Sequence, residues 1–381
     1  MRDPRLDRLA KLLVQHSTRL QQGEVILIDY EGPETRELAI ACAEQAVAAG
    51  GVPLIEENNS DFTAHFLRQG TESQIQRLGE VMLTQMKQCQ AYIGIRGAGN
   101  IFEMSGVPLE RSDWFKRHVR IPVHLNQRVE HSKWVVLRYP NPSMAQLAER
   151  NTREFADFYF RSCVFPYDAM ARAAQPLTDL MSRTDRVHIT GPGTDLHFSI
   201  KGVGVVQCTG ECNIPDGEVF TAPVRDSIEG TVKFNCRSTD RATGVAFDDI
   251  SLTFEAGKVV DLNTADPHRN DALWSILRQD EGASYIGEFA IGFHPHITHP
   301  MNDILFDEKI AGSFHMALGN AYKTADNGNR SGLHWDLVQI QRPDFGGGAI
   351  SFDDVVIRRD GRFILPELEA LNPENLGTQN C

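Results

Sequence analysis

The chain has 381 residues, 41% of them hydrophobic and 23% charged, which is enough for two domains with sizeable cores. Its formal net charge at pH 7 is −13 and only short basic pieces such as Arg358-Arg359 occur, so nucleic acid is excluded as an expected partner. No apolar run approaches the roughly 18 residues that span a bilayer, so no membrane association is expected.

The first expected element is an amphipathic helix over residues 5–20, where leucines recur at helical spacing. The N-terminus before it lacks the apolar core of a signal peptide. Seven scattered cysteines, an odd number, indicate reduced thiols. Together these features predict a cytoplasmic protein.

Strands and helices then alternate, which predicts an α/β domain with an open, mostly parallel sheet over residues 1–180. The glycines of Gly97-Ala98-Gly99-Asn100 follow the third expected strand, but they lack the full dinucleotide-binding pattern, and no P-loop lysine follows. Nucleotide binding is therefore not expected. The predicted strands are residues 25–28, 53–55, 91–95 and 134–139, and the predicted helices are residues 35–49, 74–88 and 143–165.

Residues 181–381 predict a second domain of the α+β class, largely antiparallel and catalytic, because strands and tight turns dominate there. Residues 255–258 and Asp360-Gly361 have the composition of hairpin turns. One helix is expected over residues 265–279, and the tail after Pro366 is expected to be loose.

Candidate metal ligands gather between Gly287 and Asp336, with an outlying partner at Gly217-Glu218. Glu288 and Glu218 each follow a glycine and stand in an otherwise apolar run. A buried carboxylate is costly unless a positive charge compensates it, and a bound cation is the simplest compensation. The alternative for each residue is a glutamate on an edge strand that faces water.

Residues 331–340 alternate apolar and polar side chains and therefore predict a β-strand. His334 and Asp336 would share one face of it, roughly 7 Å apart at Cα, while apolar side chains pack on the other face. A solvated pair is the alternative to a pair of ligands. The strand thus offers one face for a metal and one for a core.

His315 and Tyr322 stand between these groups. Gly319-Asn320 indicates that the segment joining them is not a regular helix. A tyrosine must lose its phenolic proton to bind a metal, a cost that a neighbouring divalent ion lowers. Without an ion, Tyr322 is more typical of a core tyrosine.

In this order the motifs resemble those of the bacterial metallo-aminopeptidases typified by aminopeptidase T and aminopeptidase S. The resemblance rests on residues 214–223, 287–292, 307–312 and 315–322 and on His334-x-Asp336. It implies a two-metal exopeptidase that acts as a homodimer on peptides with a free N-terminus. The metal ligands it implies are Glu218, Glu288, His315, Tyr322, His334 and Asp336, with Glu218 or Asp336 as the bridging, catalytic carboxylate.

The mixed oxygen and nitrogen ligands, without cysteine, suit two divalent ions of zinc, cobalt or manganese. Two such ions would activate a water for peptide hydrolysis, and one would hold the free α-amine of the substrate. The general base is left unassigned. Three carboxylates near the motifs, each expected at the surface, are Glu255, Asp303 and Glu308.

The chain departs from the family pattern after the second glutamate, where His294, His296 and His299 stand among prolines. The prolines predict an irregular surface loop. A substrate pocket or an auxiliary metal ligand is the alternative.

Two other functions stay open. The first is a mononuclear non-haem iron(II) ring-cleaving dioxygenase of the dihydroxypyridine type, since relatives on the same fold resemble this chain and would use His334 and Asp336. Retention of Glu218, Glu288 and Tyr322 favours two metals instead. The second is a binding module with a structural ion, although structural zinc sites are usually closed by four ligands.

Overall fold

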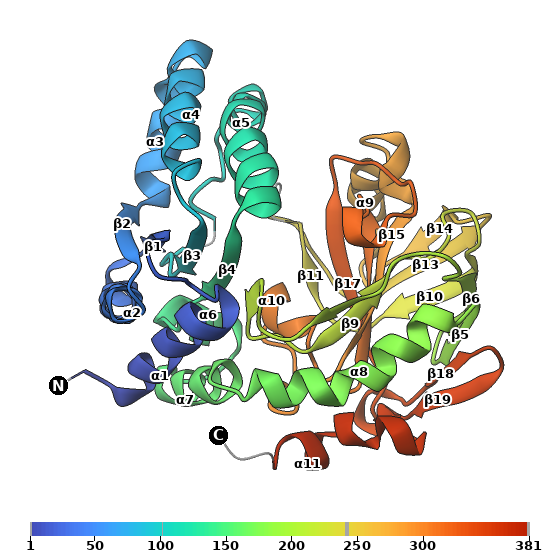
Figure 1. Ribbon diagram of the computed structural model, residues 1–381. Helices are drawn as coiled ribbons and strands as arrows, with labels where there is room; N and C mark the ends of the chain where they lie inside the picture. The colour runs from blue at the N-terminus through green and yellow to red at the C-terminus, as the bar shows by residue number, and fades with distance from the viewer. Residues whose placement is uncertain (1, 101, 241–243, 379–381) are drawn as a thin grey trace. The chain divides into compact units, whose positions relative to one another are not determined.

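The computed structural model describes residues 2–100, 102–240 and 244–378 (Figure 1). The chain divides into two compact units, each assembled from more than one segment. The first unit contains the chain up to Val164 and the segment Gly210–Pro215, and the second contains Phe165–Thr209 and most of the chain from Asp216 onward. The expected division at residue 180, with catalysis assigned to residues 181–381, stays a prediction. None of the described helices has the length and apolar character needed to cross a bilayer.

A five-stranded sheet lies at the centre of the first unit, in the order β2-β1-β3-β4-β8. Every neighbouring pair in it is parallel. β1 and β3 are buried along nearly their whole length, as expected for central parallel strands that are covered on both faces. The strands are β1 (Val25–Glu31), β2 (Val52–Asn58), β3 (Ala91–Arg96), β4 (Lys133–Arg138) and β8 (Asn213–Ile214).

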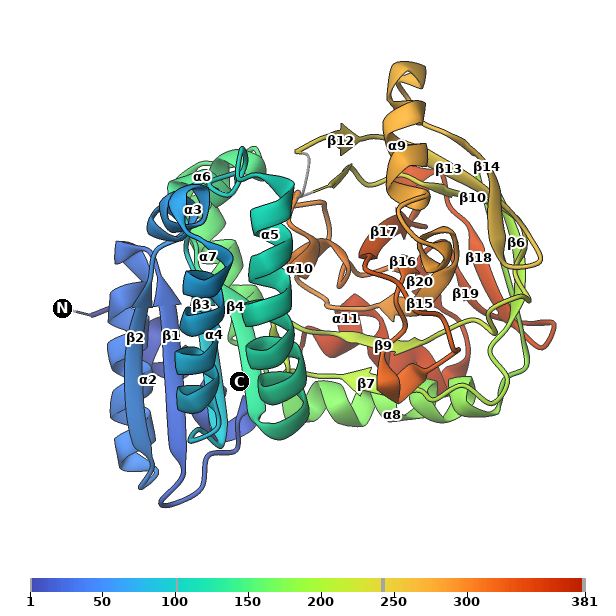
Figure 2. The same ribbon diagram turned by 90° about the horizontal axis from the view of Figure 1, so that it is seen from above.

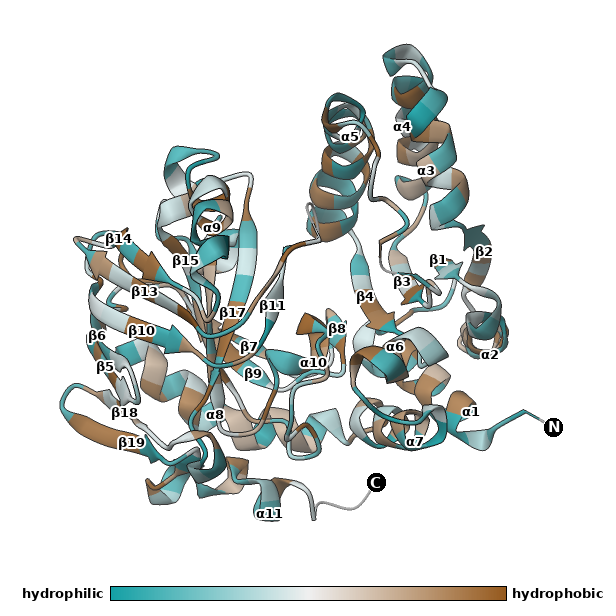
Figure 3. Cartoon of the chain, turned by 180° about the vertical axis from the view of Figure 1, so that it is seen from behind, coloured by the Kyte–Doolittle hydropathy of each residue, from teal (hydrophilic) through white to brown (hydrophobic). Residues whose placement is uncertain are grey.

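Helices cover both faces of this sheet (Figure 2). Leu27 and Tyr92 pack on one face against residues of α4 and of a helical segment, Lys116–Val129, that continues α5 and that the sequence did not predict. Figure 3 shows apolar and polar residues interspersed along α4 and α5, as amphipathic helices require. The helices are α1 (Pro4–Leu12), α2 (Arg36–Ala48), α3 (Ser60–Gln69), α4 (Glu72–Met86), α5 (Leu109–Phe115), α6 (Pro142–Leu147) and α7 (Thr152–Cys163).

The second unit contains an eight-stranded sheet, β14-β13-β10-β6-β5-β18-β19-β20, a five-stranded sheet, β17-β16-β15-β9-β7, and the small pair β11-β12. Their strand pairs are antiparallel. The predicted fold class, α/β followed by a largely antiparallel α+β part, is therefore confirmed. The strands are β5 (Arg186–Gly191), β6 (Thr194–Ser199), β7 (Val206–Cys208), β9 (Glu218–Thr221), β10 (Glu229–Phe234), β11 (Ser238–Thr239), β12 (Ala246–Phe247), β13 (Ile250–Glu255), β14 (Lys258–Asn263), β15 (Ile286–Gly292), β16 (Ser313–Gly319), β17 (His334–Ile340), β18 (Ala349–Phe352), β19 (Val355–Arg359) and β20 (Arg362–Phe363).

Both predicted hairpin turns are confirmed. Ala256 and Gly257 have φ values of 46° and 77°, and Asp360 and Gly361 have 50° and 77°. A two-residue hairpin turn of this type requires positive φ at both central positions, which glycine and aspartate tolerate best. The helices of the second unit are α8 (Tyr167–Arg183), α9 (Asn270–Leu277), α10 (Ile304–Asp307) and α11 (Pro373–Leu376).

The expectation of a loose tail after Pro366 is wrong for the described residues. A short 3-10 helix, Pro366–Leu371, and α11 follow this proline. Leu368, Leu371 and Leu376 are buried, so apolar burial holds the segment in place despite its polar composition. The six described cysteines form no disulfide, and Cys381 lies outside the described residues.

Candidate metal centre

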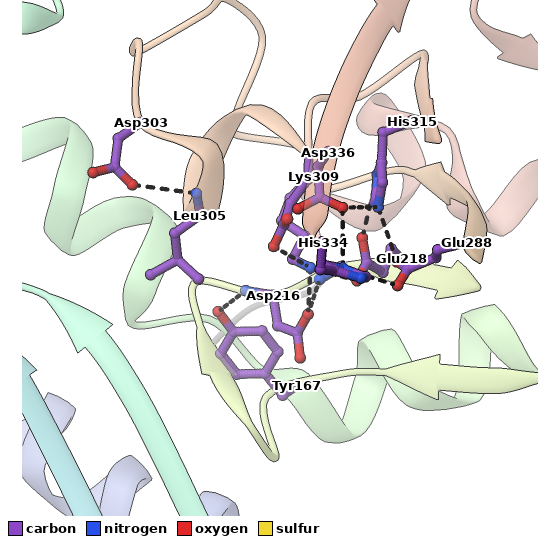
Figure 4. Close-up of polar contacts among 12 residues, drawn as sticks. Tyr167, Asp216, Glu218, Glu288, Asp303, Leu305, Lys309, His315, His334 and Asp336 are labelled. Carbon is purple, nitrogen blue, oxygen red and sulfur yellow. Dashed lines mark hydrogen bonds and ion pairs between the residues drawn. The ribbon is translucent and has the colours of Figure 1, made fainter. Parts of the chain in front are cut away.

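Five of the six expected ligands lie on one face of the five-stranded sheet (Figure 4). Ala317 of β16 pairs with Glu288 of β15 on one side and with Asp336 of β17 on the other, so both carboxylates lie in one row across three strands. Residues directly opposite each other share a face, and so do alternate residues of one strand. The pairs that add His315, His334 and Glu218 to this face are Ala290 with His315, Gly319 with His334, and Gly292 with Glu218.

The two Gly-Glu steps have a packing reason. Gly217 has a φ of +145°, and a Cβ at this position would lie 3.1 Å from Cβ of His294. A Cβ at Gly287 would lie 2.3 Å from the carbonyl oxygen of Gly319, where a bulge interrupts the pairing of β15 with β16. A side chain is therefore excluded just before each glutamate, and the backbone can approach closely there.

The opposite face of the sheet packs into the core, as the alternation in residues 331–340 predicts. Phe289, Phe314, Met316 and Leu337 are all buried. The ring of Phe289 meets that of Phe198 edge to face, with centroids 5.0 Å apart. Apolar packing on this side fixes the strands whose other side carries the ligands.

Three buried atoms of the expected ligands have no hydrogen-bond partner among the described residues: Oε2 of Glu218, Oε2 of Glu288 and Nδ1 of His315. Leaving buried polar atoms unsatisfied costs free energy, and a shared cation would satisfy these atoms. Ligand atoms of Glu218, Glu288 and His315 lie within 4.8 Å of one another, and so do those of Glu288, His334 and Asp336. Carboxylate oxygens and imidazole nitrogens of this kind fit zinc, cobalt or manganese. Glu288 belongs to both groups.

Hydrogen bonds orient both imidazoles. Nε2 of His315 lies 3.1 Å from Oε1 of Glu288. Nδ1 of His334 lies 2.9 Å from the carbonyl oxygen of Asn320, to which it donates. That bond leaves Nε2 of His334 as the atom available to a metal.

The charges of neighbouring carboxylates stabilise the protonated form of both imidazoles in the cluster. Burial disfavours the charged imidazole of His315, but Glu218 and Glu288 outweigh it and raise its pKa to about 9. Burial also opposes the charge on His334, but Asp336 and Glu288 raise its pKa to about 10. Burial raises the pKa of Glu218 to about 8. A metal would therefore displace protons from this cluster when it binds.

Tyr322 lies at the solvent-exposed end of the cluster. Its ring centroid is 4.8 Å from that of His334, and 48% of its surface is exposed. The hydroxyl end of Tyr322 is nevertheless buried. This burial, together with the charges of Glu288 and Asp336, raises the pKa of Tyr322 well above the usual value. Tyr322 would thus need a nearby cation to bind as a phenolate.

Sequence reasoning missed Lys309, which places a fully buried ammonium in the same cluster. Its Nζ lies 2.5 Å from Oε1 of Glu218, 2.8 Å from Oε1 of Glu308 and 3.5 Å from Oδ1 of Asp216. Burial opposes its charge, but Glu218 and Glu308 raise its pKa well above the usual value. The protein therefore carries a cation of its own at the Glu218 end of the cluster.

Of the three carboxylates expected at the surface, Glu255 is exposed and the other two are not. Asp303 is buried, and its Oδ1 accepts the amide hydrogen of Leu305 at the start of α10. The side chain of Glu308 is only 13% exposed, and it forms a third potential ligand group with His315 and Asp336. The expectation is wrong because α10 turns this charged stretch inward.

The histidine stretch is also less exposed than expected. His294 is fully buried beside Phe165, with ring centroids 5.1 Å apart, and its Nδ1 accepts the amide hydrogen of His296. His299 is exposed. Within the described residues, none of the groups that could hold a metal includes these histidines. The surface-loop prediction is therefore wrong for His294, because Phe293 and Ile297 anchor the segment in the core.

A sequence model described as thermophilic metalloprotease (M29) matches residues 2–363. The chain belongs to this family. The resemblance inferred from the motifs is therefore confirmed at the level of the family, and a metal-dependent hydrolase is the class to which the family assigns the chain. The family match does not favour the dioxygenase alternative.

Curated relatives support the same family. Aminopeptidase 2 of Geobacillus stearothermophilus is 34% identical over 163 residues, which is 39% of this chain and 37% of that protein. Aminopeptidase AmpS of Bacillus subtilis (strain 168) is 30% identical over 197 residues, 46% of each chain. The chain thus matches less than half the length of each of these two relatives.

Solved structures show the same fold over nearly the whole chain. Wild-type AmpT from Thermus thermophilus has a TM-score of 0.78 at 23% identity, covering 95% of this chain and 99% of that one. A 2,5-dihydroxypyridine dioxygenase from Pseudomonas putida KT2440 has a TM-score of 0.63 at 14% identity, covering 97% and 99%. Because one fold is found in proteins of such different names, the fold does not decide the reaction.

Proposed function

We propose that this chain is a metal-dependent aminopeptidase that releases N-terminal residues from peptides. The observation that supports this most strongly is the cluster of buried carboxylates and imidazoles, with unsatisfied ligand atoms, on one face of a sheet in a chain of the metalloprotease family. Relatives that match part of the chain are named aminopeptidases. Two divalent ions, of zinc, cobalt or manganese, would be held by Glu218, Glu288, His315, His334 and Asp336, with Tyr322 at the exposed end.

Bound ions would supply Lewis-acid activation of water and of the scissile carbonyl. Glu218, Glu288 and Asp336 would be the carboxylates that hold the ions, since each of them belongs to two overlapping ligand groups. Glu308 suits the general base left open by the sequence. Burial raises its pKa, so it is able to take a proton from the attacking water and pass it to the leaving amine.

Selection for a free N-terminus would come from the ions. One of them would hold the neutral α-amine of the substrate, a group that a blocked peptide lacks. A homodimer and a cytoplasmic location belong to the same proposal. The first rests on the family resemblance and the second on the seven cysteines, which are odd in number and scattered along the sequence.

A leucine peptide with a free N-terminus is expected to be hydrolysed at least a hundred times faster than its N-acetylated form. Acetylation removes the positive charge and the amine that the cluster would bind. The comparison is made by following free leucine, with the metal-loaded enzyme and again after chelator treatment, which should stop turnover of both. Equal rates for the blocked and free peptides would rule out an exopeptidase.

Elemental analysis of the purified protein, reconstituted with zinc, cobalt or manganese, is expected to count two ions per chain at the cluster, beyond any ion bound elsewhere on the chain. The reason is that the groups Glu218, Glu288, His315 and Glu288, His334, Asp336 have only Glu288 in common, so together they offer more ligands than one four-coordinate ion takes. The Asp336→Asn protein serves as the comparison, because it should lose at least one of them. One iron per chain with no peptide turnover would instead support the dioxygenase.

A further inference from the structure

We propose that His188, Asp195 and His197 form a second metal site, specific for a transition-metal dication of the zinc class. The three residues lie on β5 and β6 of the eight-stranded sheet and include no residue of the candidate metal centre. They form one of the groups in the described residues whose ligand atoms all lie within 4.8 Å of one another.

The strand register brings the three side chains together. His188 of β5 pairs directly with His197 of β6, and Asp195 precedes His197 by two residues. All three therefore share a face. Leu196, between Asp195 and His197, and Phe198, directly after His197, point to the other face and are buried. The hairpin that joins the strands is tight, with Gly193 at a φ of +68° in the turn. The ligands are thus fixed by paired backbone and not by a loop.

The imidazoles of His188 and His197 lie together beside the carboxylate of Asp195. Their rings stack with centroids 3.8 Å apart and an angle of 14° between the planes. Nε2 of His188 lies 2.8 Å from Oδ1 of Asp195, and Nε2 of His197 lies 3.4 Å from the same atom. Both nitrogens therefore face one carboxylate oxygen.

These distances suit a tetrahedral ion. Ligands about 2.0–2.1 Å from zinc at tetrahedral angles lie roughly 3.3 Å apart. The His197 contact already has this length, and the His188 contact needs to open by only about half an ångström. Without an ion, each neutral imidazole can donate its Nε2–H to Asp195. To share an ion, the two rings have to turn out of their parallel stack so that both nitrogen lone pairs point at it, and both side chains are exposed enough to allow this rotation.

The chemistry of the ligands defines the ion. Two imidazole nitrogens and one carboxylate suit zinc, nickel or copper, whereas magnesium and calcium prefer sites made of oxygens alone. The side chains of His188, His197 and Asp195 are 39%, 58% and 76% exposed, so an ion has direct access from solvent. Water would fill the remaining positions. Nearby on the sheet, Glu229 pairs with His197 and Ser351 pairs with His188.

The test is calorimetric titration of zinc chloride into the full chain and into the His188→Gln and His197→Gln variants. Both substitutions are at solvent-accessible positions outside the candidate metal centre, and circular dichroism checks that the variants stay folded. We expect the wild-type protein to bind one more equivalent of zinc than either variant, or to bind it more tightly by at least the roughly 10- to 100-fold that loss of a supporting partner costs a metal site. Zinc bound at the candidate metal centre is common to all the proteins and cancels in the comparison.

His65→Gln is the matched control. His65 is an exposed histidine whose Nδ1 lies 3.0 Å from Oδ1 of Asp61, so it repeats the imidazole and carboxylate pair without a second imidazole. This variant should titrate like the wild-type protein. Identical zinc stoichiometry and affinity in the wild-type, His188→Gln and His197→Gln proteins would overturn the proposal, as would a zinc peak at these residues that appears only in crystals soaked at millimolar concentration.

Discussion

Replacing Asp336 by asparagine is expected to abolish peptide hydrolysis while leaving the protein folded. Asparagine keeps the shape of the side chain but removes the negative charge that a divalent ion needs from this ligand. Oδ1 of Asp336 lies 3.5 Å from Nε2 of His334 and 3.9 Å from Nε2 of His315, so the same atom faces both imidazoles. The loss of activity should exceed the roughly 10- to 100-fold that removal of a supporting partner costs a metal site.

The measurement is kcat/KM for a leucine peptide over a range of metal concentrations, with circular dichroism to check the fold. Asp354→Asn is the control, since the side chain of Asp354 is 84% exposed and forms a surface ion pair with Arg186. Asp336→Asn is a cleaner test than Glu218→Ala, because truncating Glu218 also removes the nearest partner of buried Lys309. Wild-type turnover by Asp336→Asn at low metal concentration would contradict the ligand assignment.

Much of this site is predictable from local patterns. The alternation in residues 331–340 is enough to place His334 and Asp336 on one face of a strand, and the structure places them on one face of β17. The two glutamates are predictable because each stands in an apolar run after a glycine, and such runs form buried strands. Local periodicity determines on which face of its strand a side chain lies. A sheet has only two faces, so neighbouring strands that pack their apolar sides into the same core place their ligand sides on the same opposite face.

The missed residues have no such periodicity. Lys309 and Glu308 follow a four-residue helix, and a short charged run of this kind is typical of a solvated surface. What turns it inward is long-range packing of Phe306 and Ile310, both fully buried, which the local sequence does not reveal. Likewise, the buried position of His294 depends on Gly217 leaving room for it, a contact between residues 77 positions apart.

Bridging is a second point on which local sequence is silent. The family resemblance implies Glu218 or Asp336 as the shared carboxylate. In the structure Glu218, Glu288 and Asp336 each belong to two ligand groups, and Glu288 joins the group of Glu218 to that of Asp336, because the bulge at Gly287 sets Glu288 opposite Ala317, in the same row as Asp336. A register shift of one residue changes the face of every later side chain, so a bulge decides the geometry that the motif alone leaves open.

Lys309→Met is expected to destabilise the metal-free protein by about 3–5 kcal/mol, because it leaves carboxylates of Glu218 and Glu308 buried without their cation. Methionine fills a similar volume, so the loss reports charge more than packing. Because a divalent ion would supply the missing positive charge, adding zinc or manganese should restore more stability to this variant than to the wild-type protein.

The measurement is urea unfolding after chelator treatment, with and without added metal. Lys258→Met is the control, since Lys258 is an exposed lysine of β14 in the same unit and its substitution should change the midpoint little. A comparable loss in both variants would show that Lys309 does not compensate the buried carboxylates. A large loss in Lys309→Met that metal fails to recover would show that the ammonium and the ion act at separate places, since a cation bound next to Glu218 and Glu308 has to offset the same buried charge.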